Sequence, residues 1–132
     1  MTPSARVAIS ALPRGHEFTP APFKASRTDT NAYLAATGDM ASYGDAVPPL
    51  AAVALGLAAL QEQLMLPEGS LHTGQEVEQV SSIVVDEPLT LSGRVAQHSE
   101  RQGFVISVVE FEIASGDLQR LRARSTIMAP AR

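Results

Sequence analysis

Residues 47–60 read Val-Pro-Pro-Leu-Ala-Ala-Val-Ala-Leu-Gly-Leu-Ala-Ala-Leu and form the longest apolar stretch of the chain. Pro48 and Pro49 can begin a helix but cannot lie inside one, because proline lacks the backbone N–H. The sequence therefore predicts a helix from Leu50 to Leu66 that ends at Pro67. The stretch is shorter than the roughly 20 residues of a membrane span. Since the helix is apolar on nearly every face, it is predicted to be a core helix covered on several sides.

The chain after Ser70 alternates between β-forming segments and short turn sequences. Turn residues such as Asp86-Glu87-Pro88 and Ser115-Gly116-Asp117 separate the segments. Connections this short join antiparallel neighbours, so an antiparallel sheet is predicted. Its four strands are expected at His72–Val85, Leu89–His98, Phe104–Ala114 and Leu118–Met128.

The last hairpin allows a prediction of register. With residues 115–117 as the loop, Glu112 lies opposite Arg120 and Glu110 lies opposite Arg122. Opposite charges then pair on the outer face, and the inner face is apolar. The predicted inner face consists of Val109, Phe111, Ile113, Leu121 and Ala123. We interpret the arginines as solvent-exposed charges that fix the register; a phosphate or partner contact is the alternative.

An extended segment and a short helix are predicted before the central helix. Two prolines place Glu17–Ser26 at a sheet edge or in an extended segment, because proline cannot donate to a central ladder. Residues 27–38 are predicted to form a helix with Thr28 or Asp29 as its N-cap. Gly38 is expected to end this helix in the left-handed conformation.

The composition predicts one folded domain, residues 1–132, with a loose arm at residues 1–16. Of the 132 residues, 45% are hydrophobic, which is enough to form one core. The net charge of −4 argues against nucleic acid as a partner. The absence of cysteine excludes disulfides and thiolate chemistry. No apolar secretion signal opens the sequence, so a cytoplasmic location without a membrane partner is expected.

Four segments in order resemble a known family. Residues 27–29 (Arg-Thr-Asp) followed by 33–39 (Tyr-Leu-Ala-Ala-Thr-Gly-Asp) look like the opening of MaoC-like hydratase and dehydratase domains. Residues 43–49 (Tyr-Gly-Asp-Ala-Val-Pro-Pro) resemble the approach to their central helix. Residues 71–76 (Leu-His-Thr-Gly-Gln-Glu) are similar to their second strand, especially in N-terminal halves of double hot-dog dehydratases. The resemblance implies an α+β hot-dog fold, in which a curved antiparallel β-sheet wraps a central apolar helix.

The resemblance also implies chemistry on acyl thioesters. Such proteins hydrate 2-enoyl thioesters or dehydrate 3-hydroxyacyl thioesters, carried on coenzyme A or acyl carrier protein, without a cofactor. The family takes its acid and base from a segment that reads Gly-Asp-x-Asn-Pro-x-His. This chain keeps Gly38 and Asp39 but continues Met-Ala-Ser-Tyr-Gly-Asp over residues 40–45, without Asn-Pro or histidine. The missing imidazole breaks the acid–base pair.

Five residues are candidates for a site. Asp39 is either a surviving catalytic carboxylate or a loop aspartate that binds backbone amides. His72 begins the strand after the central helix and is either a catalytic base or a partner of a loop carbonyl. Gly38, Tyr43 and Gln75 are candidates for substrate binding. Tyr43 either closes an acyl tunnel or caps the core, and Gln75 and its neighbour point to opposite sheet faces. No pair of histidines has the spacing of metal ligands, so no metal is expected.

Three functional hypotheses follow. In the first, the chain is a non-catalytic subunit that helps form the acyl-thioester pocket of an enoyl-CoA hydratase or 3-hydroxyacyl dehydratase. A second hot-dog polypeptide then carries the aspartate and histidine, because the resemblance implies pockets between paired domains. In the second, the chain is a self-sufficient hydratase or thioesterase that uses Asp39 and His72, with Glu76. In the third, it is a homodimer that binds an acyl ligand without chemistry.

Overall fold

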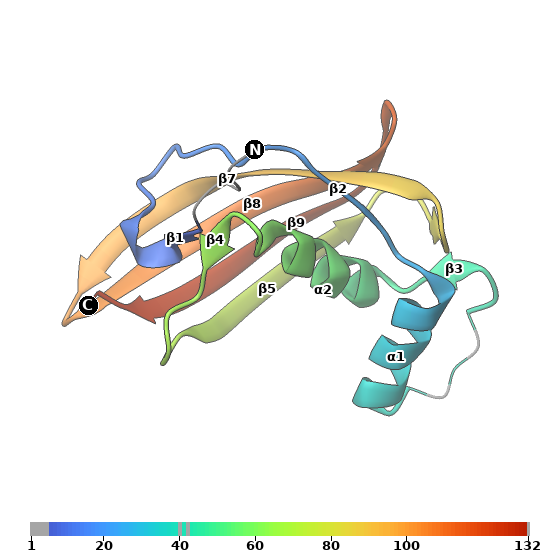
Figure 1. Ribbon diagram of the computed structural model, residues 1–132, viewed down its shortest axis with the longest axis horizontal. Helices are drawn as coiled ribbons and strands as arrows, with labels where there is room; N and C mark the ends of the chain where they lie inside the picture. The colour runs from blue at the N-terminus through green and yellow to red at the C-terminus, as the bar shows by residue number, and fades with distance from the viewer. Residues whose placement is uncertain (1–5, 40, 42, 132) are drawn as a thin grey trace.

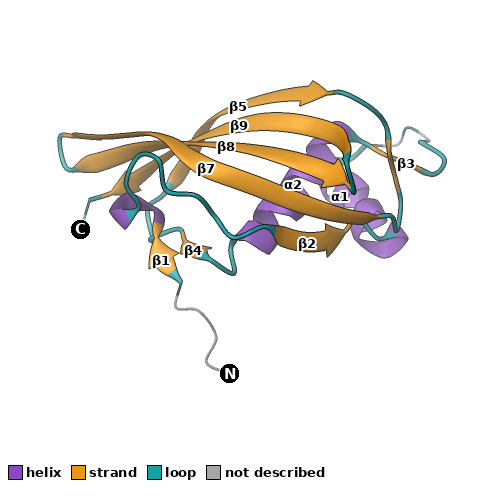
Figure 2. Cartoon of the chain, turned by 90° about the horizontal axis from the view of Figure 1, so that it is seen from above, coloured by secondary structure: helices purple, strands orange, loops and turns teal. Residues whose placement is uncertain are grey.

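A five-stranded antiparallel sheet curves around one helix in the computed structural model, which describes residues 6–39, 41 and 43–131 (Figure 1). The strand order is β2-β7-β8-β9-β5. These strands are β2 (Ala21–Lys24), β5 (Leu71–Gln79), β7 (Pro88–Arg101), β8 (Phe104–Ser115) and β9 (Leu118–Pro130). Figure 2 shows β5, β9, β8 and β7 side by side, with the helix α2 (Pro49–Leu60) beneath the sheet. The predicted arrangement, a central apolar helix wrapped by a curved antiparallel sheet, is confirmed.

The helix α2 begins one residue before the predicted Leu50, at the proline pair that was predicted to start it, and lies in close contact with the sheet. Pro48 is its N-cap and Pro49 its first residue. Gly56 brings the helix close to the sheet, since a Cβ there would lie 2.9 Å from Leu91 Cδ1 and 3.3 Å from Ile113 Cδ1. In the described residues, no helix is long and apolar enough to cross a membrane.

The predicted end of this helix at Leu66 is wrong, because α2 ends at Leu60. The side chain of Gln63 accepts a hydrogen bond from Thr19 N at 2.8 Å and donates one to Thr19 O at 2.7 Å. The next two residues form β4 (Leu64–Met65), which pairs in parallel with β1 (Val7–Ala8). Contacts with a segment distant in sequence therefore end the helix early.

The described part of the predicted N-terminal arm packs against the core. After β1, residues Ile9–Ala11 form a 3₁₀ helix, η1. Ile9 is fully buried and Leu12 is 5% exposed. Residues 6–16 are therefore not loose, because two apolar side chains anchor them; residues 1–5 lie outside the described residues.

The short helix α1 (Arg27–Thr37) projects from one end of the sheet (Figure 1). Its N-cap is Ser26, whose Oγ accepts a hydrogen bond from Asp29 N at 3.0 Å. The predicted caps, Thr28 and Asp29, are wrong, since the N-cap lies two residues before Thr28 and three before Asp29. Gly38 ends the helix with φ of 71°, as predicted.

The predicted first strand of the sheet is two separate strands. β5 ends at Gln79, and β6 (Ile83–Val84) pairs instead with β3 (Ala46–Val47) in a small second sheet. In the main sheet β5 lies beside β9 and not beside β7, the next long strand in the sequence. The segment between β5 and β7 therefore crosses from one side of the sheet to the other.

The predicted hairpin register is wrong by two residues, although the predicted faces are correct. Glu112 lies opposite Arg122 and Glu110 opposite Arg124, because the turn is tighter and a β-bulge follows Ile113. A shift by two keeps every side chain on its face, since the period of a strand is two. The predicted inner residues are all buried: Val109, Phe111, Ile113, Leu121 and Ala123.

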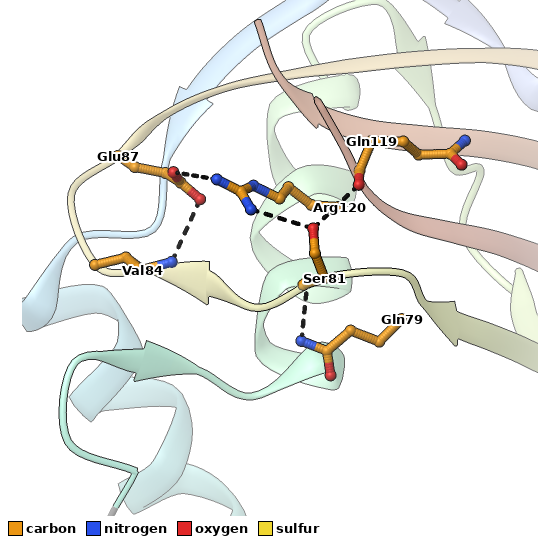
Figure 3. A network of polar contacts seen from close by, with 6 residues as sticks. All are labelled: Gln79, Ser81, Val84, Glu87, Gln119 and Arg120. Atoms are coloured by element: carbon orange, nitrogen blue, oxygen red, sulfur yellow. Dashed lines mark hydrogen bonds and ion pairs between the residues drawn. The ribbon is translucent and has the colours of Figure 1, made fainter. Parts of the chain in front are cut away.

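Arg120 does not have the predicted role of a solvent-exposed register charge. Its guanidinium donates to Ser81 Oγ at 3.1 Å and to Glu87 Oε2 at 3.2 Å (Figure 3). The Arg120 and Glu87 side chains are only 19% and 17% exposed. Ser81 Oγ also donates to Gln119 O at 3.2 Å. Arg120 thus fixes the segment that crosses from β5 to β7.

We expect Arg120→Met to lower the free energy of unfolding by about 2 kcal/mol, between the values for exposed and for buried ion pairs. The substitution leaves Glu87 without its cation in a mostly buried place. Urea denaturation measures the change. The matched control is Arg122→Met on the same strand, whose pair with Glu78 is 51% and 65% exposed, and which should cost less than about 1 kcal/mol. Equal losses in the two variants would contradict this role.

Candidate functional site

The loop after α1 holds the first predicted catalytic residue, Asp39. The Tyr43 hydroxyl donates to Asp39 Oδ2 at 2.5 Å, and the backbone N–H of Ala41 donates to Oδ1 at 2.9 Å. These two hydrogen bonds hold the pKa of the Asp39 carboxyl below its ordinary value of 3.8. The same contact with Asp39 raises the pKa of Tyr43 above 10.0. Asp39 therefore binds a backbone amide, as in the second of the two predicted interpretations, and it also binds a tyrosine.

Arg27 on α1 binds the end of this loop that precedes α2. Its guanidinium donates to Gly44 O at 2.7 Å and to Asp45 Oδ1 at 2.5 Å. The two side chains are 48% and 79% exposed, so the pair adds little stability. Its effect is to set where the loop lies before α2 begins.

His72, the second predicted catalytic residue, borders an apolar cavity of about 230 Å³. The cavity lies between the C-terminal end of α2, β4 and the beginning of β5. It is lined by Leu57, Leu60, Gln61, Leu64, Leu66, Ser70, Leu71, His72, Val109 and Ile127. Leu71 and Leu66 are 58% and 38% exposed, so apolar surface extends out of the cavity. A short aliphatic group is the ligand that such a lining favours.

The structure does not bring Asp39 and His72 together. Asp39 follows α1 at one end of the molecule, whereas β5 starts at the opposite end (Figure 1). The cavity beside His72 is lined by residues of α2, β4, β5, β8 and β9 and the turns next to them, and by none of the residues that the structure describes in the loop of Asp39. These two residues therefore do not form an acid–base pair within one chain.

Gln75 points toward the core, and its neighbour Glu76 points outward. Ser125 is fully buried, and its Oγ donates to Gln75 Oε1 at 2.7 Å. The amide of Gln75 donates to Arg124 O at 3.2 Å. The polar atoms of the Gln75 side chain are therefore already hydrogen-bonded within the chain. Its contact with a substrate stays a prediction. Gly38, another residue predicted to bind substrate, supplies the left-handed turn after α1.

Two buried polar groups escaped the sequence analysis. His98 on β7 lies directly opposite Ser107 on β8. His98 Nδ1 and Ser107 Oγ are buried, and neither has a hydrogen-bond partner in the described residues. Only the strand register could have placed them opposite each other, since eight residues of the hairpin lie between them in the sequence. Among the described residues, no three histidine, aspartate or glutamate side chains are grouped so that they could hold a metal ion.

We expect Tyr43→Phe to raise the pKa of Asp39 toward its ordinary value, because the stronger of its two hydrogen bonds is lost. A carboxyl with a lowered pKa in the folded state stabilises the fold above pH 3.8 and loses this effect as the pH falls through that lowered pKa. Tyr43→Phe should weaken this acid dependence. Titration of the Asp39 carboxyl carbon by NMR measures the shift, with Tyr33→Phe as the control. An unchanged titration would contradict the Tyr43 contact.

This fold, one apolar helix in a curved antiparallel sheet, is that of the hot-dog proteins. No family model and no curated protein sequence matches the chain. Among solved structures, it is similar to a MaoC-like dehydratase from Rhodospirillum rubrum, with 12% identity and a TM-score of 0.71 over 96% of this chain and 98% of the other. It is similar to the (R)-hydratase PhaJ1 from Pseudomonas aeruginosa, with 16% identity and a TM-score of 0.69 over 95% and 86%.

A third similar structure is a complex of two different chains. It is the C-terminally truncated HadBC (3R-hydroxyacyl-ACP dehydratase) complex from Mycobacterium tuberculosis. The identity is 16% and the TM-score 0.64, over 92% of this chain and all of the other. The resemblance to MaoC-like hydratases and dehydratases found in the sequence is thus confirmed as a likeness of fold.

Proposed function

We propose that this chain is a non-catalytic hot-dog subunit that helps form the acyl-thioester pocket of an enoyl-CoA hydratase or 3-hydroxyacyl dehydratase. A second hot-dog polypeptide supplies the acid and the base. One observation carries the proposal: the Asp39 loop has no imidazole and its carboxylate is bound by Tyr43 and Ala41, while an apolar cavity is kept at the other end of α2.

The groups in the Asp39 loop are poorly matched to proton transfer near neutral pH. Hydration needs an acid and a base with pKa values near the working pH, both within hydrogen-bond reach of the reacting atoms. The lowered pKa of Asp39 makes it a weaker base, and the raised pKa of Tyr43 makes it a weaker acid. Both shifts oppose catalysis, which favours a supporting role for this loop.

The size and position of the cavity favour a pocket that a partner completes. Ligand sites usually measure about 300–1,000 Å³, and the cavity beside His72 measures about 230 Å³. Its lining is mostly aliphatic, and exposed Leu71 continues the apolar surface onto strand β5 at the edge of the sheet. A second chain seated against this edge would enlarge the cavity and cover that surface.

Two similar structures are complexes of different chains, which supports a heteromeric assembly here. One is the HadBC complex, and the other is the ChsH1–ChsH2 complex from Mycobacterium tuberculosis, with 13% identity and a TM-score of 0.65. A complex of this kind would pair this chain, which lacks the histidine of the Gly-Asp-x-Asn-Pro-x-His segment, with a second chain that has it.

The test compares the purified chain alone with the chain co-expressed with a MaoC-like polypeptide encoded beside its gene. Loss of enoyl absorbance follows the hydration of a 2-enoyl-CoA. We expect no hydration above the uncatalysed rate by the chain alone, and a turnover of about 10 s⁻¹, typical of enzymes, from the complex. Native mass spectrometry should show a heteromer. Enzyme-like hydration by the chain alone would contradict the proposal, and a ligand-bound homodimer without activity in either sample would favour an acyl-binding protein.

A further inference from the structure

Strand β5 leaves one long side of the sheet open. In the described residues β5 forms ladder hydrogen bonds on one side only, with β9. The opposite edge strand, β2, has four residues and contains Pro22, which cannot donate a hydrogen bond. β5 has nine residues and no proline. An open edge of this length is a template for another strand, so β5 is the edge that suits a partner.

Charged side chains form two rows across the outer face of the sheet, the face turned away from α2. In the first row, the register aligns Arg94 on β7, Glu110 on β8, Arg124 on β9 and Glu76 on β5. Arg94 and Glu110 are 3.7 Å apart, and Arg124 and Glu76 are 3.9 Å apart. The charges therefore alternate across four strands, and the row ends at the open edge with a carboxylate.

The second row ends in the same way. Glu112, Arg122 and Glu78 lie on β8, β9 and β5 in that order, and Arg122 contacts Glu78 at 2.8 Å. The side chains of Glu76 and Glu78 are 78% and 65% exposed. β5 itself contains neither lysine nor arginine. A strand added beside β5 therefore meets two carboxylates on the outer face.

Strand β5 of a second copy of this chain is a poor partner for the open edge. In a two-fold antiparallel pairing, outward side chains lie opposite outward side chains. If Val77 lies on the axis, Glu76 faces Glu78 of the other copy, and Glu78 faces its Glu76. Shifts by two residues bring the same carboxylates opposite or diagonal to each other. Like charges opposite one another destabilise a strand pair, so these glutamates act against self-association.

We propose that the open edge of β5 docks the edge strand of a second hot-dog chain that carries lysine or arginine at the outward positions facing Glu76 and Glu78. The alternating rows then continue across the joined sheets. The inference rests on the proposed function, because it names the partner of that subunit by its chemistry. It explains why this chain takes a different chain as its partner.

The first experiment removes the two charges. The variant Glu76→Gln/Glu78→Gln should self-associate with a dissociation constant about tenfold lower than that of the unmodified chain, because two like-charged contacts per dimer disappear. Sedimentation equilibrium measures the constant. The matched control, Glu110→Gln/Glu112→Gln, makes the same change of charge on β8 inside the sheet and should leave the constant unchanged. Equal self-association of the β5 variant and the unmodified chain would overturn the inference.

The second experiment places the proposed basic side chains of the partner on a copy of this chain. A Glu76→Lys/Glu78→Lys copy mixed with the unmodified chain should form a one-to-one heterodimer, detected by native mass spectrometry. This heterodimer should weaken as salt is added, because screening removes the attraction. Circular dichroism confirms folding, and if the lysine variant fails to fold, the glutamine variant alone decides. Both readouts measure association and not activity, so a chain that hydrates enoyl-CoA alone would refute the proposed function and leave these results standing.

Discussion

Gly56→Leu is expected to lower the free energy of unfolding by about 3 kcal/mol, the upper part of the range for an overpacked core. Gly56 lies where α2 is closest to the sheet. A Cβ at this position would lie 2.9 Å from Leu91 Cδ1, 3.3 Å from Ile113 Cδ1 and 3.4 Å from Phe23 Cζ. Leucine adds three further carbons to this space. The helix must then move away from β2, β7 and β8, and core contacts on both sides are lost.

Two control variants separate crowding from helix propensity. Gly56→Ala should change stability by less than about 1 kcal/mol, because the gain of roughly 1 kcal/mol in helix propensity offsets a clash with the end of the Leu91 side chain. Ala58→Leu makes a large residue on the exposed side of the same helix and should cost less than about 0.5 kcal/mol. Urea denaturation of the three variants tests the packing. A Gly56→Leu variant as stable as the unmodified chain would show that α2 is not held this close to the sheet.

The second large effect concerns which chain carries the chemistry. In the proposed complex, replacing the histidine of the partner's Gly-Asp-x-Asn-Pro-x-His segment should lower kcat by about 10²-fold or more, as expected for loss of a general acid–base group. Asp39→Asn in this chain should change kcat by less than about twofold. The contrast follows from the separation of Asp39 and His72 and from the two hydrogen bonds that already engage Asp39.

Steady-state kinetics of the purified complex measure both variants, with native mass spectrometry to show that each complex still forms. If Asp39→Asn abolishes turnover while the complex remains intact, this chain contributes a catalytic group and the self-sufficient alternative gains support. If both single substitutions lower kcat strongly, the active site is shared between the two chains. Either result would contradict a purely supporting role.

Local patterns in the sequence determined the elements and their faces. The apolar run after Pro48 specified the central helix, and the two prolines at 20 and 22 specified an edge segment. The alternation of residues 109–113 with charged neighbours specified which side of β8 meets the core. These features follow from the sequence because helix and strand periods are set by the backbone alone. The two-residue error in the hairpin register left the face prediction intact for the same reason.

Tertiary contacts determined where elements end and which elements meet. Gln63 stops α2 by binding Thr19, 44 residues away, and Ile9 and Leu12 draw the N-terminal segment onto the core. The placement of β5 beside β9, the burial of Arg120 and the distance between Asp39 and His72 depend on the same kind of contact. Local sequence fixes the direction in which a side chain points. Which residues it contacts depends on how segments distant in the sequence pack together in one core. The sequence therefore named Asp39 and His72 as candidates, but it could not show that they lie at opposite ends of the molecule.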